Sequence, residues 1–163
     1  MKTVVIYNSQ TGFTKRYAEW IAEETGADCF ELSVAKKKNL EEYDTIVFGG
    51  WACAGGISKL SWFKGNLNKW KNKKLIAFCV GGSPIENPEI EEALKRNFDG
   101  AEFEKVHAFY CPGGFNYEKM SKTSKVMMKM FIKSLKAKKN KFKINIHPLL
   151  CGWIFVYSLF FKM

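Results

Sequence analysis

The chain lacks the residue patterns that most catalytic and metal-binding sites require. Its 163 residues include only two histidines, His107 and His147, and no serine stands in a G-x-S-x-G motif. We therefore assign no catalytic side chain and no metal ligand, because neither a zinc cluster nor a serine–histidine triad can be assembled. The five cysteines form no C-x-x-C pair. Their odd number argues against a disulfide framework and for reduced thiols in the cytoplasm.

Acidic residues are scarce in the last third of the chain. Residues 1–110 carry 15 Lys and Arg against 15 Asp and Glu, whereas residues 111–163 carry 11 Lys against the single acid Glu118. The net charge of +10 therefore belongs to the C-terminal third. The length predicts one domain over residues 1–163, made of a core (1–115), a basic helix (116–143) and an apolar tail (144–163). Met1-Lys2 leads directly into a strand, so we expect no secretory signal peptide.

An apolar strand, a polar turn and a helix follow one another at the start of the chain. The first amides of a helix have no partner within it, and the helix dipole favours an anion there. Hydroxyl groups in the turn add donors, and Gly12 lets the backbone approach the oxygens. These features predict a phosphate site, the alternative being a capped turn that binds nothing. Its residues are Ser9, Gln10, Thr11, Gly12, Phe13 and Thr14. The turn has neither the lysine of a nucleoside triphosphate P-loop nor a G-x-G-x-x-G sequence.

Strands and helices alternate along the rest of the core. Further strands are expected over 27–33, 45–48, 74–80 and 105–111, with helices over 58–70 and 88–98. Glycine-bearing loops follow the strands at 49–57 and 81–84. This pattern predicts an α/β fold with three layers, built on a doubly wound five-stranded parallel sheet in the order 2-1-3-4-5. Ligands bind beyond the carboxyl ends of the strands in such sheets, at the switch point between strands 1 and 3.

The motif Ser9-x-Thr11-Gly12-x-Thr14, with Ala18 and Ile21 on the next helix, resembles the FMN-phosphate loop of the flavodoxin family. The resemblance implies FMN as cofactor, with Trp51 stacking on the flavin ring and backbone amides facing its polar edge. The implied ring contacts are Gly50, Trp51, Ala52, Cys53, Ala54, Gly55 and Gly56, then Gly81, Gly82 and Ser83. Three alternatives stay open: Trp51 as a surface tryptophan, Cys53 as a small residue in a tight turn, and 81–84 as an ordinary turn.

A lysine stripe marks the helix expected over 117–139. Its members recur at steps of three and four residues and comprise Lys122, Lys125, Lys129, Lys133 and Lys136. Methionine and phenylalanine side chains fall on the opposite face. Such a helix suits either an anionic membrane surface or packing on its own domain with the lysines in water, and the second arrangement is the default. Nucleic-acid binding is not expected, since the stripe holds no arginine and no alternating aromatic platform.

The segment Tyr110-x-Pro112-Gly113-Gly114-Phe115-Asn116-Tyr117, with the lysine-rich helix after it, resembles a branch of the family related to menaquinone-dependent protoporphyrinogen dehydrogenases. That branch is membrane-associated and passes electrons to a quinone. Residues 144–161 depart from the family, because they carry no charge where a final amphipathic helix is expected. They are an abnormal last helix on the sheet, a membrane-associating tail or an altered terminus.

The function that the sequence favours is an FMN-binding flavodoxin-like redox protein. It would carry electrons or oxidise a small substrate, with a redox protein or a quinone as partner. We expect it in the cytoplasm, with peripheral attachment to the inner face of the membrane as a further hypothesis. The alternative is a membrane-surface interaction module that keeps the fold without flavin.

Overall fold

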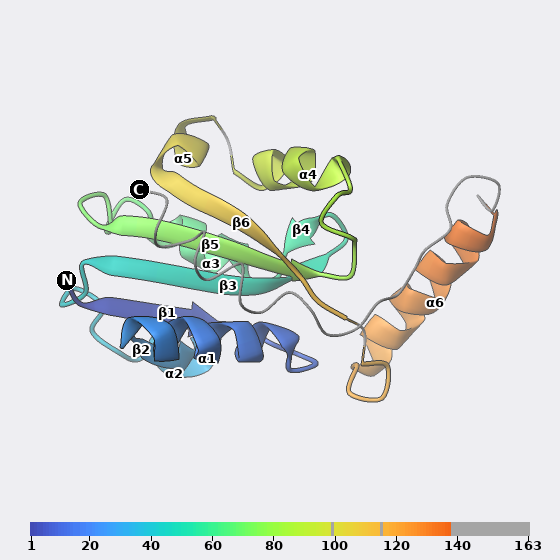
Figure 1. Cartoon of the computed structure of the whole chain (residues 1–163), viewed down its shortest axis with the longest axis horizontal. Helices are drawn as coiled ribbons and strands as arrows, with labels where there is room; N and C mark the ends of the chain where they lie inside the picture. The colour runs from blue at the N-terminus through green and yellow to red at the C-terminus, as the bar shows by residue number, and fades with distance from the viewer. Residues whose placement is uncertain (99, 115, 138–163) are drawn as a thin grey trace. The chain divides into compact units, whose positions relative to one another are not determined.

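The computed structural model describes residues 1–98, 100–114 and 116–137, and the chain divides into two compact units, 1–115 and 116–163. Figure 1 shows the elements along the chain. In the described residues they are β1 (Thr3–Tyr7), α1 (Phe13–Thr25), β2 (Asp28–Glu31), α2 (Leu32–Ala35), β3 (Thr45–Cys53), β4 (Gly56–Ile57), α3 (Leu60–Asn66), β5 (Lys74–Gly81), α4 (Glu89–Asn97), α5 (Gly100–Lys105), β6 (Val106–Pro112) and α6 (Lys122–Ala137). That both units form one domain stays a prediction.

The first unit is built on a parallel sheet in the order β2-β1-β3-β5-β6. The short β4 lies off this path and pairs antiparallel with β3. The five parallel strands confirm the predicted order, since β5 and β6 are the fourth and fifth strands of that prediction. The register brings Tyr7 beside Gly49, Trp51 beside Val80 and Gly81 beside Pro112. The carboxyl ends of β1, β3, β5 and β6 therefore lie at one edge of the sheet.

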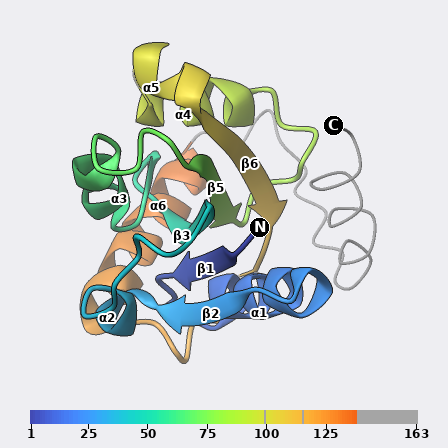
Figure 2. The same ribbon diagram turned by 90° about the vertical axis from the view of Figure 1, so that its left-hand side faces the viewer.

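Helices cover both faces of this sheet (Figure 2). Alternate strand residues, among them Val4, Ile6 and Phe48, are fully buried in a cluster with residues of α2 and α3. Within it Phe48 stacks on Phe63 with ring centroids 5.3 Å apart. On the other face α1 buries Ala18, Ile21 and Ala22, which recur at helical spacing. The apolar strands predicted from sequence are thus the middle layer of three.

Several element bounds differ from those predicted. The strand expected over 45–48 continues to Cys53, so part of the loop expected over 49–57 is sheet. The strand expected over 27–33 ends at Glu31, where the short α2 begins. Gly100 was expected to end a helix but begins α5. The reason lies in Phe98, which is extended and 2% exposed: burying its ring ends α4 before the glycine is reached.

The second unit contains α6, which begins five residues later than predicted. Ser121 precedes it and acts as its cap, since the backbone N–H of Ser124 donates to Ser121 Oγ at 3.2 Å. Residues 138–163, with the predicted apolar tail, lie outside the described residues, as do the side chains of Lys133 and Lys136. No helix within the described ranges is both long and apolar enough to cross a bilayer.

Candidate functional site at the carboxyl edge of the sheet

The loop between β1 and α1 leaves the N-terminus of α1 open. Gly12 is the N-cap and has the left-handed φ of 98°, which favours glycine, and no side chain caps the helix. A Cβ on Gly12 would meet nothing within 4 Å, and the first turn of α1 carries no acidic residue. The Gly12 N–H donates to Ser9 Oγ at 3.2 Å, which folds the turn back on itself. The unpartnered amides and the dipole of α1 thus make this end suitable for an anion.

The predicted phosphate residues differ in accessibility. Gly12 is exposed, and Ser9, Gln10, Thr11 and Phe13 are half-buried. Thr14 is only 1% exposed, so Ser9 and Thr11 are the hydroxyl residues of this loop that solvent reaches. Neutral hydroxyls and amides, with no acid in the first turn, are the donor set that a phosphate dianion needs.

The glycine pair at 49–50 does not form the turn that the sequence predicted. Both glycines lie in β3, where they allow close packing: a Cβ on Gly50 would lie 2.5 Å from Ile57 Cγ2, and one on Gly49 would overlap the Phe78 ring. The chain reverses instead at Ala54 and Gly55, with φ of 49° and 81°. The predicted ring contacts from Gly50 to Gly56 therefore form a β-hairpin, on which Trp51 is half-buried.

Two asparagines that sequence reasoning missed fix this hairpin. Asn8 donates from its backbone N–H to Gly49 O at 2.8 Å and from Nδ2 to Ser58 Oγ at 2.6 Å. Asn97, at the end of α4, accepts from the Ile57 N–H through Oδ1 at 3.1 Å and donates through Nδ2 to Gly55 O at 3.1 Å. The first bond set joins the phosphate loop to the hairpin, and the second holds the hairpin from the α4 side.

The third predicted segment, Gly81 to Ser83, lies beside the hairpin. A Cβ on Gly81 would be 3.1 Å from Ala52 Cβ and 2.8 Å from Tyr110 Oη. The Gly113 N–H donates to Gly81 O at 2.6 Å, and Ser83 is bonded to Tyr110. Gly82 and Ser83 are exposed. The register and these contacts bring all three predicted segments to one edge of the sheet.

The segment after β6 closes the same edge against α1. Tyr17 Oη donates to Pro112 O at 2.7 Å. A Cβ on Gly114 would lie 2.9 Å from Phe13 Cζ, so the backbone there lies directly against the Phe13 ring.

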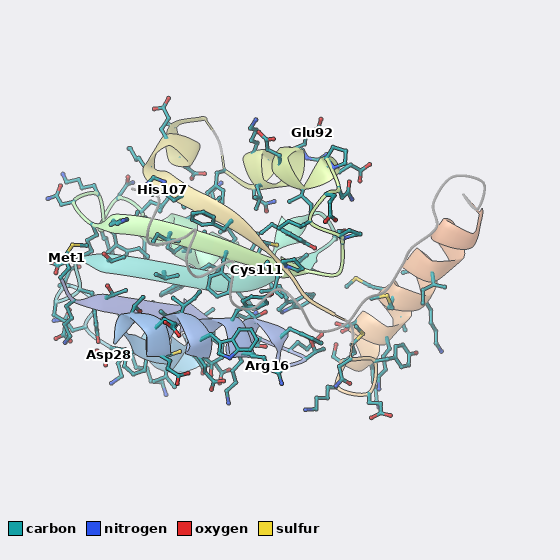
Figure 3. The ribbon with its side chains drawn as sticks, in the orientation of Figure 1. Met1, Arg16, Asp28, Glu92, His107 and Cys111 are labelled. Atoms are coloured by element: carbon teal, nitrogen blue, oxygen red, sulfur yellow. The ribbon has the colours of Figure 1, made fainter. Side chains whose placement is uncertain are left out.

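In Figure 3 Arg16 and Cys111 lie toward this carboxyl edge, and Met1, Asp28 and His107 lie toward the amino edge. A polar hollow of about 430 Å³ also lies at the amino edge, away from the predicted residues, and is lined by Met1, Lys2, Thr3, Thr25, Gly26 and Asp28.

Two thiols on the strands that lead to this edge are buried. Burial raises the pKa of Cys79 to about 12 and also raises the pKa of Cys111, which favours the protonated thiol at neutral pH. Cys29, Cys53, Cys79 and Cys111 are free thiols, and Cys151 lies outside the described residues. At this edge the chain places the N-terminus of α1, which has no side-chain cap, beside the β3–β4 hairpin and the loop after β5. These residues would suit a ligand that carries a phosphate and a flat ring system.

Comparisons with known proteins identify the family of the chain. The family model described as "Flavodoxin domain" matches residues 4–141. An uncharacterized protein of Methanocaldococcus jannaschii is 29% identical over 119 residues, covering 72% of this chain and 79% of the relative. A flavodoxin, WrbA-like protein from Agrobacterium tumefaciens is 27% identical with a TM-score of 0.43, over 52% of this chain and 62% of that one. A flavoprotein in complex with FMN from Lactobacillus acidophilus is 18% identical with a TM-score of 0.47, over 68% and 92%.

Proposed function

This chain belongs to the flavodoxin-domain family, and from that membership we propose that it is an FMN-binding redox protein. The observation that carries the proposal is the uncapped N-terminus of α1 behind Gly12, next to the accessible hydroxyls of Ser9 and Thr11. When bound, FMN would supply reversible uptake of electrons. The chain's own residues would bind, orient and shield the cofactor.

We assign the proposed contacts by segment. The phosphate would be held by Ser9, Gln10, Thr11, Gly12, Phe13 and Thr14. The hairpin from Gly50 to Gly56, with Trp51 as the stacking residue, and the segment from Gly81 to Ser83 would hold the ring. The bonds of Asn8 and Asn97 support the assignment, because they fix the hairpin before any ligand binds.

Reconstitution with FMN and with riboflavin, which lacks the phosphate, tests this assignment. The wild-type protein should retain the visible flavin spectrum after excess FMN is removed, and it should bind riboflavin at least tenfold more weakly. Thr11→Glu should lower the affinity for FMN by tenfold or more, through repulsion of the phosphate, and change riboflavin affinity little. Thr123→Glu adds the same charge to α6 and serves as the matched control. A protein that takes up no FMN contradicts the proposal.

The redox partner is a finer proposal, and it rests on the resemblance of the segment from Tyr110 to Tyr117 to menaquinone-dependent protoporphyrinogen dehydrogenases. We propose a quinone or a redox protein as partner. The test is reduction of a soluble quinone by the FMN-loaded protein, with protoporphyrinogen and with a general reductant as electron source. Turnover with the general reductant alone would favour an electron carrier over that dehydrogenase activity.

A second candidate function, attachment to an anionic membrane surface, is favoured by the side chains of α6. Met130 is 60% exposed and Val126 is 57% exposed, and they lie one helical turn apart beside Lys122 and Lys129. Apolar side chains flanked by lysines suit the interface of an anionic bilayer. Flotation with anionic and with neutral vesicles tests this candidate. Binding should be confined to anionic vesicles and should be lost when Lys122, Lys125, Lys129, Lys133 and Lys136 become glutamine.

A further inference from the structure

A side chain from the neighbouring strand holds the loop after β5. Tyr110 lies on β6 opposite Cys79, with its ring buried and the residue 9% exposed. Its hydroxyl accepts a hydrogen bond from the Ser83 N–H at 2.8 Å and donates one to Ser83 O at 2.9 Å. One hydroxyl thus engages both backbone groups of a residue that is itself exposed.

The absence of a side chain at Gly81 leaves room for the Tyr110 hydroxyl to reach Ser83. A Cβ on Gly81 would lie 2.8 Å from Tyr110 Oη and 2.9 Å from Cε2, so only glycine at this position leaves the path clear. The Gly113 N–H donates to Gly81 O and fixes the start of the same segment. A tyrosine hydroxyl is protonated at neutral pH, and burial raises the pKa of Tyr110 further from neutrality, so the proton that it donates is present.

We propose that Tyr110 is a positioning residue for the flavin: its hydroxyl fixes the Ser83 peptide, and thereby holds the Gly81–Ser83 segment in the conformation that receives the ring. This inference rests on the proposed function. A buried phenyl ring alone would fill the same space, so packing accounts for the ring of Tyr110 and leaves the hydroxyl unexplained. The bonds to Ser83 give the hydroxyl a role, because a loop ordered in advance loses less entropy on binding.

Tyr110→Phe tests the proposal, and Tyr43→Phe is its matched control. Tyr43 is also buried, at 3% exposed, and its hydroxyl donates to Asp28 Oδ2 at 2.7 Å toward the amino edge. Both variants lose one hydroxyl and keep the ring. Tyr110→Phe should weaken FMN binding about tenfold and change the midpoint potential of the bound flavin, whereas Tyr43→Phe should leave both unchanged. Gly81→Ala, which displaces the hydroxyl by another route, should reproduce the loss.

Amide hydrogen exchange in the protein without FMN gives a readout that does not depend on the cofactor. The Ser83 amide should exchange faster in Tyr110→Phe, with little change in the residues of β5. Wild-type affinity for FMN in Tyr110→Phe, or an equal loss in Tyr43→Phe, overturns the positioning role alone. A wild-type protein that takes up no FMN overturns the proposed function and this role with it. Unchanged exchange at Ser83 shows that the hydroxyl does not hold the peptide.

Discussion

The two edges of the sheet are held by different chemistry. At the amino edge charged side chains bond to one another and to the backbone: Lys2 Nζ lies 2.5 Å from Glu42 Oε2, and the Lys2 N–H donates to Asp44 Oδ2 at 2.7 Å. At the carboxyl edge most links come from neutral groups, the amides of Asn8 and Asn97 and the hydroxyl of Tyr110, and one charged group, Lys64 Nζ, donates to Asn97 O at 3.2 Å. Partners at the amino edge satisfy one another, whereas the carboxyl edge holds its loops in place and leaves the amides of α1 without a side-chain cap. We infer that the first edge serves stability and the second serves binding.

The largest effect is expected where the carboxyl edge is packed most tightly. In Gly50→Ala the new Cβ would lie 2.7 Å from the Ser58 carbonyl oxygen, which is backbone and cannot move aside. We expect a loss of about 2–3 kcal/mol in the free energy of unfolding, measured by urea denaturation. Gly65→Ala in α3 is the control, because nothing lies within 4 Å of its Cβ and alanine favours a helix. An equal loss in both variants would contradict the close approach at Gly50.

Variants of Asn97 test how much the β3–β4 hairpin contributes to FMN binding, separately from the rest of the fold. Asn97→Ala removes the acceptor for the Ile57 N–H and the donor to Gly55 O, and we expect FMN affinity to fall about tenfold. Asn97→Asp keeps the acceptor and should lose less. Flavin fluorescence titration measures both variants. Identical losses would mean that the bond to Gly55, and not the one to Ile57, holds the hairpin.

Tyr43→Phe is expected to affect stability at the amino edge without affecting FMN. Loss of the bond to Asp28 should cost about 1 kcal/mol of unfolding free energy at neutral pH. Burial first, and then the bond to Asp28, raise the pKa of Tyr43 in the folded protein to about 12. Because the pKa of Tyr43 is higher in the folded protein than in the unfolded chain, where it is roughly 10, the protonated hydroxyl stabilises the folded state fully at pH values below 10. That stabilisation is lost as the pH rises from 10 toward 12. The stability difference between wild type and Tyr43→Phe should therefore shrink over this window, as alkaline denaturation series would measure. A constant difference would contradict the pKa shift.

The smallest effect is expected at the turn of the hairpin. Ala54 adopts a φ of 49°, which alanine disfavours and glycine accepts freely. Ala54→Gly should therefore raise the free energy of unfolding by about 0.5 kcal/mol, after the greater entropy of glycine in the unfolded chain is subtracted. Thermal unfolding measures the change, and Ala52→Gly, in β3 of the same hairpin, should lower stability. A loss in Ala54→Gly would show that the turn is not strained.

The order of the sheet could be predicted from sequence because strand periodicity and the alternation with helices are local patterns. Val4, Ile6 and Ile46 are buried as their apolar runs indicate. The hairpin was missed because Gly49 and Gly50 read as turn residues. Glycine is required at these two positions because the Phe78 ring and the Ile57 side chain occupy the space that a Cβ would fill. The sequence does not show which side chains pack against a glycine. The cap at Ser121 is different, since Ser121 lies just before the lysine-rich run and could have been recognised.

The sequence predicts the separate segments of the candidate site but not the hydrogen bonds that connect them. Ser9 to Thr14 is recognisable because its donors are neighbours in sequence. Tyr110 and Ser83 are 27 residues apart, and Asn97 and Ile57 are 40 apart, so no local pattern connects them. Which of the predicted residues contact FMN stays a prediction until the reconstitution is done.

The tip of the β3–β4 hairpin is a position where the chain can accept inserted residues. Ala54 and Gly55 are exposed, and a Cβ on Gly55 would meet nothing within 4 Å. The bases of the two strands are anchored by pairing with β5 and by Ser58, whose N–H donates to Trp51 O. Residues inserted between Ala54 and Gly55 would therefore extend into solvent and leave the parallel sheet untouched. An insertion at this position would lengthen the hairpin without changing the buried core of the sheet.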